Sequence, residues 1–262
     1  MNKPLMLLIA AACATSSVAH ADTLYTVIDD GSKFASINPT TLALTVIGNT
    51  GAGGSFGDLA YDDVSRTMYW VGGRGNDNLY TINMSTGAAT LVGNHGVSDM
   101  FSLGWNGSGL YAQSTNGSVY SLSTSTGAAT SIGSNSIYPG GFDFNPVTGQ
   151  MVSVAAGSGD IHAINLSNGS STLLGNAGYV NDADIAFDAG RNVYWAIDYD
   201  KSLYKYDAAT YARTTVIAGS LPYGTASLEY VGAVPEPETY ALLLAGLGLM
   251  GAVARRRQSC KR

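Results

Sequence analysis

Short runs of alternating hydrophobic and polar residues dominate residues 22–232, and Gly, Asn, Asp and Ser separate these runs. In the run LYTI at residues 79–82, for example, alternate side chains would face opposite sides of a sheet. The runs are rich in Val, Ile, Tyr and Thr, which favour strands. Helical periodicity is confined to a weak trace near residues 207–211. The pattern therefore predicts an all-β body of short strands joined by tight turns.

The same runs recur along the chain as a repeat. Residues 33–49, 78–94, 118–134, 160–176 and 202–218 can be aligned with one another. Their glycines, Gly48, Gly93, Gly133 and Gly175, are 45, 40 and 42 residues apart. Each full unit has four runs, and the first run of each lies at residues 57–62, 102–107, 141–146 and 184–189. This period and this number of runs are typical of a four-stranded β-propeller blade.

The two ends of the body complete each other. Residues 24–49 supply the second, third and fourth runs of a unit, and residues 226–230 resemble a first run without followers. Joined, they predict a fifth blade closed by both termini, because an open array would expose unpaired strand edges. We therefore expect a five-bladed β-propeller over residues 22–232. A β-sandwich and an open β array are the alternatives.

Residues 1–21 predict a secretory signal helix. Lys3 supplies the positive start, residues 5–12 are apolar, and Ala19 and Ala21 fit the small residues that precede a cleavage site. The apolar run is too short for a membrane anchor, which needs about 20 residues. We expect cleavage after Ala21.

Residues 233–262 contain three features in a fixed order. The motif Val234, Pro235, Glu236 and Pro237 is followed by an uncharged apolar run at residues 240–254 and then by Arg255, Arg256 and Arg257. The prolines hold the chain extended, and the apolar run predicts a short C-terminal transmembrane helix. The arginines would remain cytoplasmic and place the body outside. A simple stop-transfer anchor has the same features.

This tail resembles the PEP-CTERM sorting signal of bacterial exported proteins. Residues 234–237 match its motif, and residues 240–257 match its hydrophobic and basic parts. The resemblance implies processing near the motif by a membrane enzyme of the exosortase type. It also implies a Gram-negative bacterium that makes exopolysaccharide or a biofilm matrix. The mature body would then lie in the cell envelope, at the surface or in the extracellular matrix, and the membrane would hold it only before processing.

Charge and cysteine content narrow the range of partners. Residues 22–254 contain seven basic residues and all 19 acidic ones, so this part of the chain lacks the clustered cations that nucleic-acid binding requires. Cys13 and Cys260 lie in the two terminal signals. The body therefore has neither a disulfide nor a thiolate metal site.

Two acidic clusters are candidates for metal binding. Asp182 with Asp184, and Asp198 with Asp200, offer the oxygen ligands that Ca²⁺ takes, although neither pair follows an EF-hand loop. Capping of turns by Asp explains both clusters equally well without a metal. Three further carboxylates, Asp62, Asp143 and Asp188, recur near one place in different blades, which favours a turn role over chemistry. We expect no resident cofactor, with Ca²⁺ as the one alternative.

No residue pattern predicts a catalytic centre. The body has two histidines, His95 and His162, too few for a three-histidine zinc site, and it has no nucleophile elbow, phosphate loop or dinucleotide fingerprint. Two carboxylates that converged with Arg74 or Arg191 at one mouth of the ring would favour an enzyme.

Aromatic residues are the other candidates for function. Trp70, Trp105 and Trp195 lie in first and second runs, where they could contact a matrix polysaccharide or wedge adjacent blades together. We interpret the chain as an exported binding or structural protein of the envelope or biofilm matrix. The alternative is an extracellular lyase or hydrolase that acts on polysaccharide.

Overall fold

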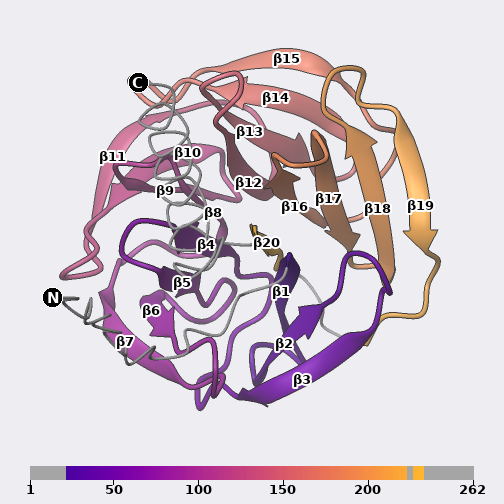
Figure 1. Cartoon of the computed structure of the whole chain (residues 1–262). Coiled ribbons are helices and arrows are strands. Elements are labelled where there is room, and N and C mark those ends of the chain that lie inside the picture. Colours follow the sequence, from indigo (N-terminus) through magenta and orange to yellow (C-terminus); the bar gives the residue numbers. More distant parts are fainter. Residues whose placement is uncertain (1–21, 223–226, 233–262) are drawn as a thin grey trace, which may run out of the picture. The chain divides into compact units, whose positions relative to one another are not determined.

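The computed structural model describes residues 22–222 and 227–232, and the segment Asp22–Gly232 forms one compact unit. Its strands form five antiparallel four-stranded sheets, arranged as blades around a common axis (Figure 1). This confirms the five-bladed propeller predicted from the repeat. No described residue belongs to a helix that is long and apolar enough to cross a membrane. The predicted signal helix and C-terminal transmembrane helix lie outside the described residues.

Each blade runs outward from an inner strand at the axis to an outer strand on the circumference. In ring order the blades are β20 (Glu229–Val231), β1 (Thr23–Ile28), β2 (Lys33–Ile37) and β3 (Leu44–Asn49); β4 (Leu59–Asp62), β5 (Thr67–Val71), β6 (Asn78–Ile82) and β7 (Ala89–Asn94); β8 (Met100–Trp105), β9 (Leu110–Ser114), β10 (Ser118–Leu122) and β11 (Ala129–Ser134); β12 (Pro139–Asn145), β13 (Gln150–Ala155), β14 (Asp160–Ile164) and β15 (Ser171–Asn176); and β16 (Ala183–Asp188), β17 (Val193–Asp198), β18 (Ser202–Asp207) and β19 (Arg213–Ile217).

The ring is closed by β20, which comes from the C-terminal end of the body. It pairs antiparallel with β1, so that Leu24 lies opposite Tyr230 and Tyr25 opposite Glu229. This is the pairing that the unmatched runs predict, although the strand is shorter than residues 226–230 suggest. The two ends of the body are thereby held in one sheet, between the inner strands β16 and β4.

The hydrophobic core is divided among the spaces between neighbouring blades. Five clusters of buried side chains each join residues of two adjacent blades. Trp70 packs between the β4–β7 blade and the blade closed by β20, and Trp195 packs on the other side of that closing blade. Burial of large apolar surface between sheets therefore stabilises the ring as a whole.

The repeated glycines allow the outer edges of neighbouring blades to approach closely. Gly93 on β7 lies against the β10–β11 turn of the next blade, where a Cβ would overlap the carbonyl oxygen of Thr126. That turn itself requires the left-handed backbone of Gly127, with φ of 75°. Gly48 and Gly133 lie against the following blade in the same way. The sequence period near 42 residues thus corresponds to one blade-to-blade contact.

The outer strands of all five blades share one irregularity. In every blade the pairing of the third and fourth strands shifts by one residue, which marks a β-bulge. Bulges twist a strand edge away from regular pairing, which discourages edge-to-edge association of exposed strands. Each outer edge therefore has a built-in protection against joining a second molecule.

Candidate functional site at the mouth of the ring

Aromatic and charged side chains gather at the face of the ring where the inner strands begin. We call five of them the mouth cluster: Phe56 in the loop before β4, Arg74 after β5, Phe101 on β8, Tyr138 before β12 and Tyr199 after β17. These residues come from four of the five blades. The cluster is therefore a product of the closed ring and of no single repeat.

Phe56 is the centre of the mouth cluster. Its ring stacks on Phe101 with centroids 5.4 Å apart, and it lies 5.2 Å from the ring of Tyr199. Its backbone adopts a left-handed conformation, with φ of 59°, which is uncommon and costly for a residue other than glycine. A backbone hydrogen bond from Arg74 N–H to Ser55 O, at 2.7 Å, holds this loop in place. The fold thus holds Phe56 between Phe101 and Tyr199 in spite of the backbone strain.

Arg74 supplies the positive charge of the mouth cluster. Its guanidinium carbon lies 4.9 Å from the ring centroid of Phe56 and 5.1 Å from that of Phe101. Both distances allow cation–π attraction. The side chain is 52% exposed, and Asp99 approaches it at 3.9 Å. Arg74 is therefore oriented by two aromatic rings while its donors remain accessible to solvent.

Asp182 adds a titratable carboxyl next to the cluster. Its loop is held by the buried Asp198 carboxylate, which accepts the backbone N–H groups of Asn181 and Asp182 at 3.0 to 3.2 Å. Burial and, to a smaller extent, the Asp198 carboxylate raise the pKa of Asp182 to about 7, against the opposing effect of Arg74. The mouth of the ring thus contains a carboxyl group that changes charge near neutral pH.

Four buried acidic residues line the axis of the ring: Asp58, Asp143, Asp184 and Glu229. Three of them accept a backbone N–H of the next blade, in its inner strand or directly before it: Asp58 from Leu103 at 2.7 Å, Asp143 from Phe187 at 2.5 Å and Asp184 from Leu228 at 2.6 Å. Glu229 hydrogen-bonds to the backbone of Tyr61 in the following blade. These residues, which we call the axial carboxyls, tie one blade to the next.

Burial of the axial carboxyls favours their neutral form. It raises the pKa of Asp143 to about 7 and that of Asp184 to about 8. The pKa values of Asp58 and Glu229 are also raised well above their usual range, first by burial and then by neighbouring carboxyls. Asp58 and Asp184 share a side-chain hydrogen bond, although their blades are not adjacent. The axial carboxyls therefore have a structural role beneath the mouth.

Comparison with known proteins identifies the tail. Residues 233–258 match the family described as the PEP-CTERM protein-sorting motif. The chain carries a PEP-CTERM sorting motif. This motif implies export to the cell envelope or surface in bacteria and processing by exosortase, as the resemblance of residues 234–257 suggested. No curated protein matches the chain in sequence.

Solved structures match the propeller body in fold. One is the crystal structure of a nidogen/laminin complex, with a TM-score of 0.57 and 14% identity over 79% of this chain and 80% of that one. Another is a structural genomics protein of unknown function from Bacteroides thetaiotaomicron, with a TM-score of 0.58 and 14% identity over 84% of this chain and 66% of that one. At this identity the likeness concerns the fold alone.

The tryptophans that the sequence offers as ligand contacts lie mostly in the core of the propeller body. Trp70 and Trp195 are each 1% exposed. Trp105 is partly buried, and its ring stacks on Tyr69 with centroids 6.4 Å apart. This placement favours the packing alternative, because a ligand could not reach the two buried rings without separating the blades.

The turn role expected for three aspartates holds for two of them. Asp62 accepts the N–H groups of Val64 and Ser65, and Asp188 accepts that of Arg191. Asp143 does not occupy this position, since it lies two residues earlier in its inner strand and faces the axis. The expectation for Asp143 is therefore corrected: Asn145 is the turn residue of that blade.

The remaining predicted site residues fall into two groups. Ala19, Ala21, residues 234–237 and residues 255–257 lie outside the described residues. In the described part of the chain, no three His, Cys, Asp or Glu side chains form a group that could hold a metal ion. Asp198 accepts the backbone N–H of Asp182 in the loop before β16, and Asp200 accepts that of Ser202 in its own turn.

Sequence reasoning missed the aromatic members of the mouth cluster. Phe56 and Tyr199 are 143 positions apart, and they contact each other only because the ring brings their blades together. One signal was present in the sequence: Phe56, Phe101 and Tyr138 each lie at or just before the start of an inner strand. Of the two arginines considered in the sequence, Arg74 lies in the mouth cluster, whereas Arg191 pairs with Asp22 and Asp188 elsewhere.

Proposed function

We propose that the mature body is a binding protein of the bacterial cell envelope or biofilm matrix and that its ligand is a polysaccharide bound over the mouth cluster. The single observation that carries this proposal is the convergence of three partly exposed aromatic rings, Phe56, Tyr138 and Tyr199, and a half-exposed Arg74 around the buried ring of Phe101. Binding sites in proteins typically combine aromatic surface with a few well-placed polar groups. Aromatic faces can stack on the apolar faces of sugar rings, and Arg74 can donate to hydroxyl groups.

The charges around the cluster favour a neutral polysaccharide over a polyuronate. Asp99 and Asp182 both lie close enough to Arg74 to interact with it electrostatically. An anionic polymer would meet these carboxylates, and like charges placed together oppose binding. Tyr138, which is 42% exposed, extends the aromatic surface beyond the ring centre.

A glycan array tests the proposal directly. Residues 22–232 should bind neutral glycans more strongly than uronate polymers, with and without Ca²⁺. The Arg74→Ala variant should weaken binding by about tenfold or more, as expected for the central side chain of a binding site. Arg213→Ala is the matched control, because Arg213 also lies over a tyrosine ring, at 4.8 Å, but on the outer strand β19. Equal losses in both variants, or no binding by the body, would contradict the proposal.

A polysaccharide lyase or hydrolase is the second candidate, and Asp182 is the observation that favours it. A carboxyl with a pKa of about 7 beside an arginine is suited to proton transfer at neutral pH. The Asp198 carboxylate, however, accepts the backbone N–H groups of Asn181 and Asp182 in the loop before β16, so a pair of substrate-facing carboxylates is not formed by these two residues. New reducing ends or unsaturated sugars after incubation with the array's best ligand, lost in Asp182→Asn, would support the enzyme.

We further propose that sorting leaves the ring intact. β20 ends at Val231, four residues before Pro235, so processing near the motif would keep the closing strand in the mature protein. Mass spectrometry of the mature C-terminus tests this. A terminus before Val231 would contradict it, and replacing Pro235, Glu236 and Pro237 with alanine should leave the protein in the membrane.

A further inference from the structure

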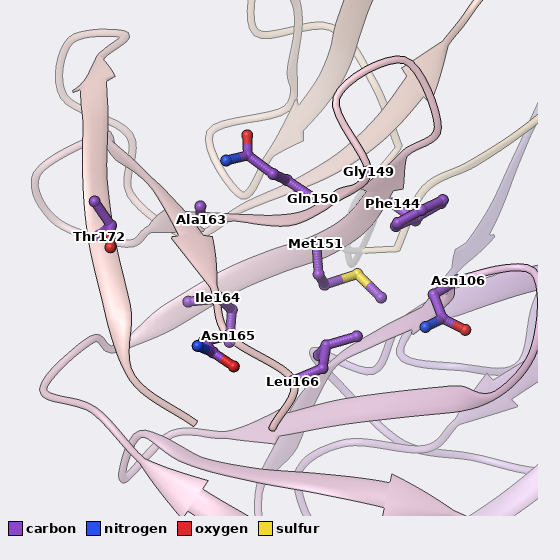
Figure 2. Close-up of a pocket in the computed structure, with 10 residues that line it drawn as sticks. All are labelled: Asn106, Phe144, Gly149, Gln150, Met151, Ala163, Ile164, Asn165, Leu166 and Thr172. Atoms are coloured by element: carbon purple, nitrogen blue, oxygen red, sulfur yellow. The ribbon is translucent and has the colours of Figure 1, made fainter. Parts of the chain in front are cut away.

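A pocket opens on the opposite face of the ring, where the inner strands end. It has a volume of about 380 Å³ and lies between the β8–β11 and β12–β15 blades (Figure 2). Its walls combine apolar side chains, Phe144, Met151, Ile164 and Leu166, with the amides of Asn106, Gln150 and Asn165. The volume is at the lower end of the range for small-molecule sites, and it suits a single ring with substituents.

The next pair of blades shows one way in which the equivalent space is filled. At the junction of the β12–β15 and β16–β19 blades, Tyr194 occupies the strand position that Met151 occupies in its own blade, since each is paired with the aromatic residue before the inner-strand turn. The Tyr194 hydroxyl accepts a buried hydrogen bond of 2.9 Å from the Asn145 amide. A phenol ring and its hydroxyl thus complete that junction.

Asn106 is the counterpart of Asn145, and hydrogen bonds of its turn hold its amide in the same way. The side-chain oxygen of Asn106 accepts the N–H groups of Ser108 and Gly109 at 3.0 and 2.9 Å, as that of Asn145 accepts those of Val147 and Thr148. These bonds fix the amide plane and leave its nitrogen to donate. Figure 2 shows this nitrogen on the side of Met151 and Leu166. In the described part of the chain it has no acceptor, because Met151 has no hydroxyl.

Met151 neither fills this space nor offers an acceptor to the Asn106 amide. Its thioether lies against Gly104, where a Cβ would meet both the Met151 sulfur and the Phe142 carbonyl at 2.9 Å. Gly104 therefore allows the flexible Met151 side chain to lie back against the inner strand. The pocket has an amide donor and an apolar wall, as the next junction has, but lacks the ring and the hydroxyl with which Tyr194 completes that junction.

We propose that this pocket binds a pyranose ring, with the Asn106 amide donating to a sugar hydroxyl in the place of the tyrosine hydroxyl found at the next junction. Two further amides favour a sugar over a phenol. The Gln150 side chain has no hydrogen bond in the described part of the chain, and the Asn165 amide nitrogen is likewise without an acceptor, its oxygen being bonded to Ser167. A sugar offers several hydroxyls to such groups, whereas a phenol offers one.

Saturation-transfer NMR of residues 22–232 tests the site with methyl β-glucopyranoside, methyl β-galactopyranoside, methyl α-mannopyranoside and phenol as probes. At least one pyranoside should bind in preference to phenol. Met151→Tyr should abolish that binding while leaving the melting temperature unchanged or higher, because the new ring fills the pocket and accepts from Asn106. Asn106→Ala should weaken binding by about five- to thirtyfold, the range for loss of one hydrogen bond to a ligand.

Arg74→Ala separates this site from the mouth cluster, since it should leave pyranoside binding here unchanged. If Met151→Tyr does not fold, Leu166→Phe provides a second way to fill the pocket and should have the same effect. The proposal is overturned if no pyranoside binds the unaltered body, if phenol binds better, or if binding survives both the filled pocket and the loss of the Asn106 amide.

Discussion

On the circumference of the ring the blades present nearly the same outer hairpin, whereas at the axis the blades present different side chains. The outer turns begin with a residue whose side chain accepts the N–H groups that follow, Asn38, Asn83, Asn165 and Asp207 among them. One register position of the inner strands, by contrast, holds Ala60, Gly104, Asp143, Ala186 and Glu229.

This difference separates residues that make a packing contact common to all blades from residues that make a contact at one position only. A residue that recurs in each unit, such as Gly93 and its counterparts, meets a packing demand common to all blades. A residue that occurs once, such as Phe56 or Asp143, meets a demand of its own position on the axis. The repeat thus explains the scaffold, and the departures from the repeat mark the mouth cluster and the axial carboxyls.

The largest loss of stability is expected when the ring is opened by removal of its closing strand, β20. Deleting residues 223–232 removes β20, the Glu229 link and the buried Val231, so the body should unfold or aggregate through the exposed edges of β1. Thermal unfolding followed by circular dichroism measures this. Deletion of residues 239–262 is the control and should leave the transition of the body unchanged. A closed propeller would be the wrong description if the 223–232 deletion melts like the full body.

A change of pH should have a smaller effect on the stability of the body. The carboxyls at the axis and those on the circumference should contribute to it with opposite signs. The axial carboxyls have raised pKa values, so their contribution to stability is complete below the unfolded pKa of about 4 and is lost as the pH rises through about 7 and 8. The carboxyl of Asp207 on an outer turn has a lowered pKa, because Thr210 donates to it, so its contribution is lost only in acid.

The melting temperature of the body should therefore fall between about pH 5 and about pH 8. Asp143→Asn removes one titrating group and keeps an acceptor for Phe187, so it should make this fall shallower. Asp207→Asn should leave the slope over this range unchanged. A melting temperature that rises with pH over the range, or an Asp143→Asn slope equal to that of the unaltered protein, would contradict the assignment.

The smallest of the three effects concerns one contact on the circumference. Gly93→Ala places a methyl group against the Thr126 carbonyl and should destabilise the body by about 1–3 kcal/mol, the usual cost of overpacking. For a domain of this size that lowers the melting temperature by roughly 2–4 °C per kcal/mol. Gly53→Ala is the matched control, because no atom lies within 4 Å of its added Cβ. Equal melting temperatures for the two variants would show that the blades can yield at this contact.

The sequence allowed the scaffold to be predicted because its signals are local. Alternation identifies strands, the Gly93 type of contact imposes the repeat, and the unmatched run at residues 226–230 points to closure by β20. The mouth cluster could not be predicted in the same way, since contacts such as Phe56 with Tyr199 join loops from different blades. Burial of Trp70 and Trp195 was also undecided in the sequence, because the same residue type serves in wedges between blades and on binding surfaces.

The fine distinctions at the axis depend on register. Asp143 lies two residues before the turn position of Asp62 and Asp188, and only the strand pairing shows that its side chain faces a neighbouring blade. The pocket beside Asn106 likewise depends on which residue faces Met151 across a blade junction. A shift of two residues keeps the side chain on the same face of the strand but moves it away from the turn, so that its carboxylate accepts from the next blade in place of its own turn.

Amide hydrogen exchange of residues 22–232, measured with and without the best-binding glycan of the array, tests most directly whether binding takes place where the blades differ. The account predicts slower exchange in the loops of the mouth cluster, around Phe56, Arg74, Tyr138 and Tyr199, with unchanged exchange along β3, β7 and β15. Slower exchange along the outer strands, with the mouth loops unaffected, would contradict it and would place the binding surface on the repeated circumference.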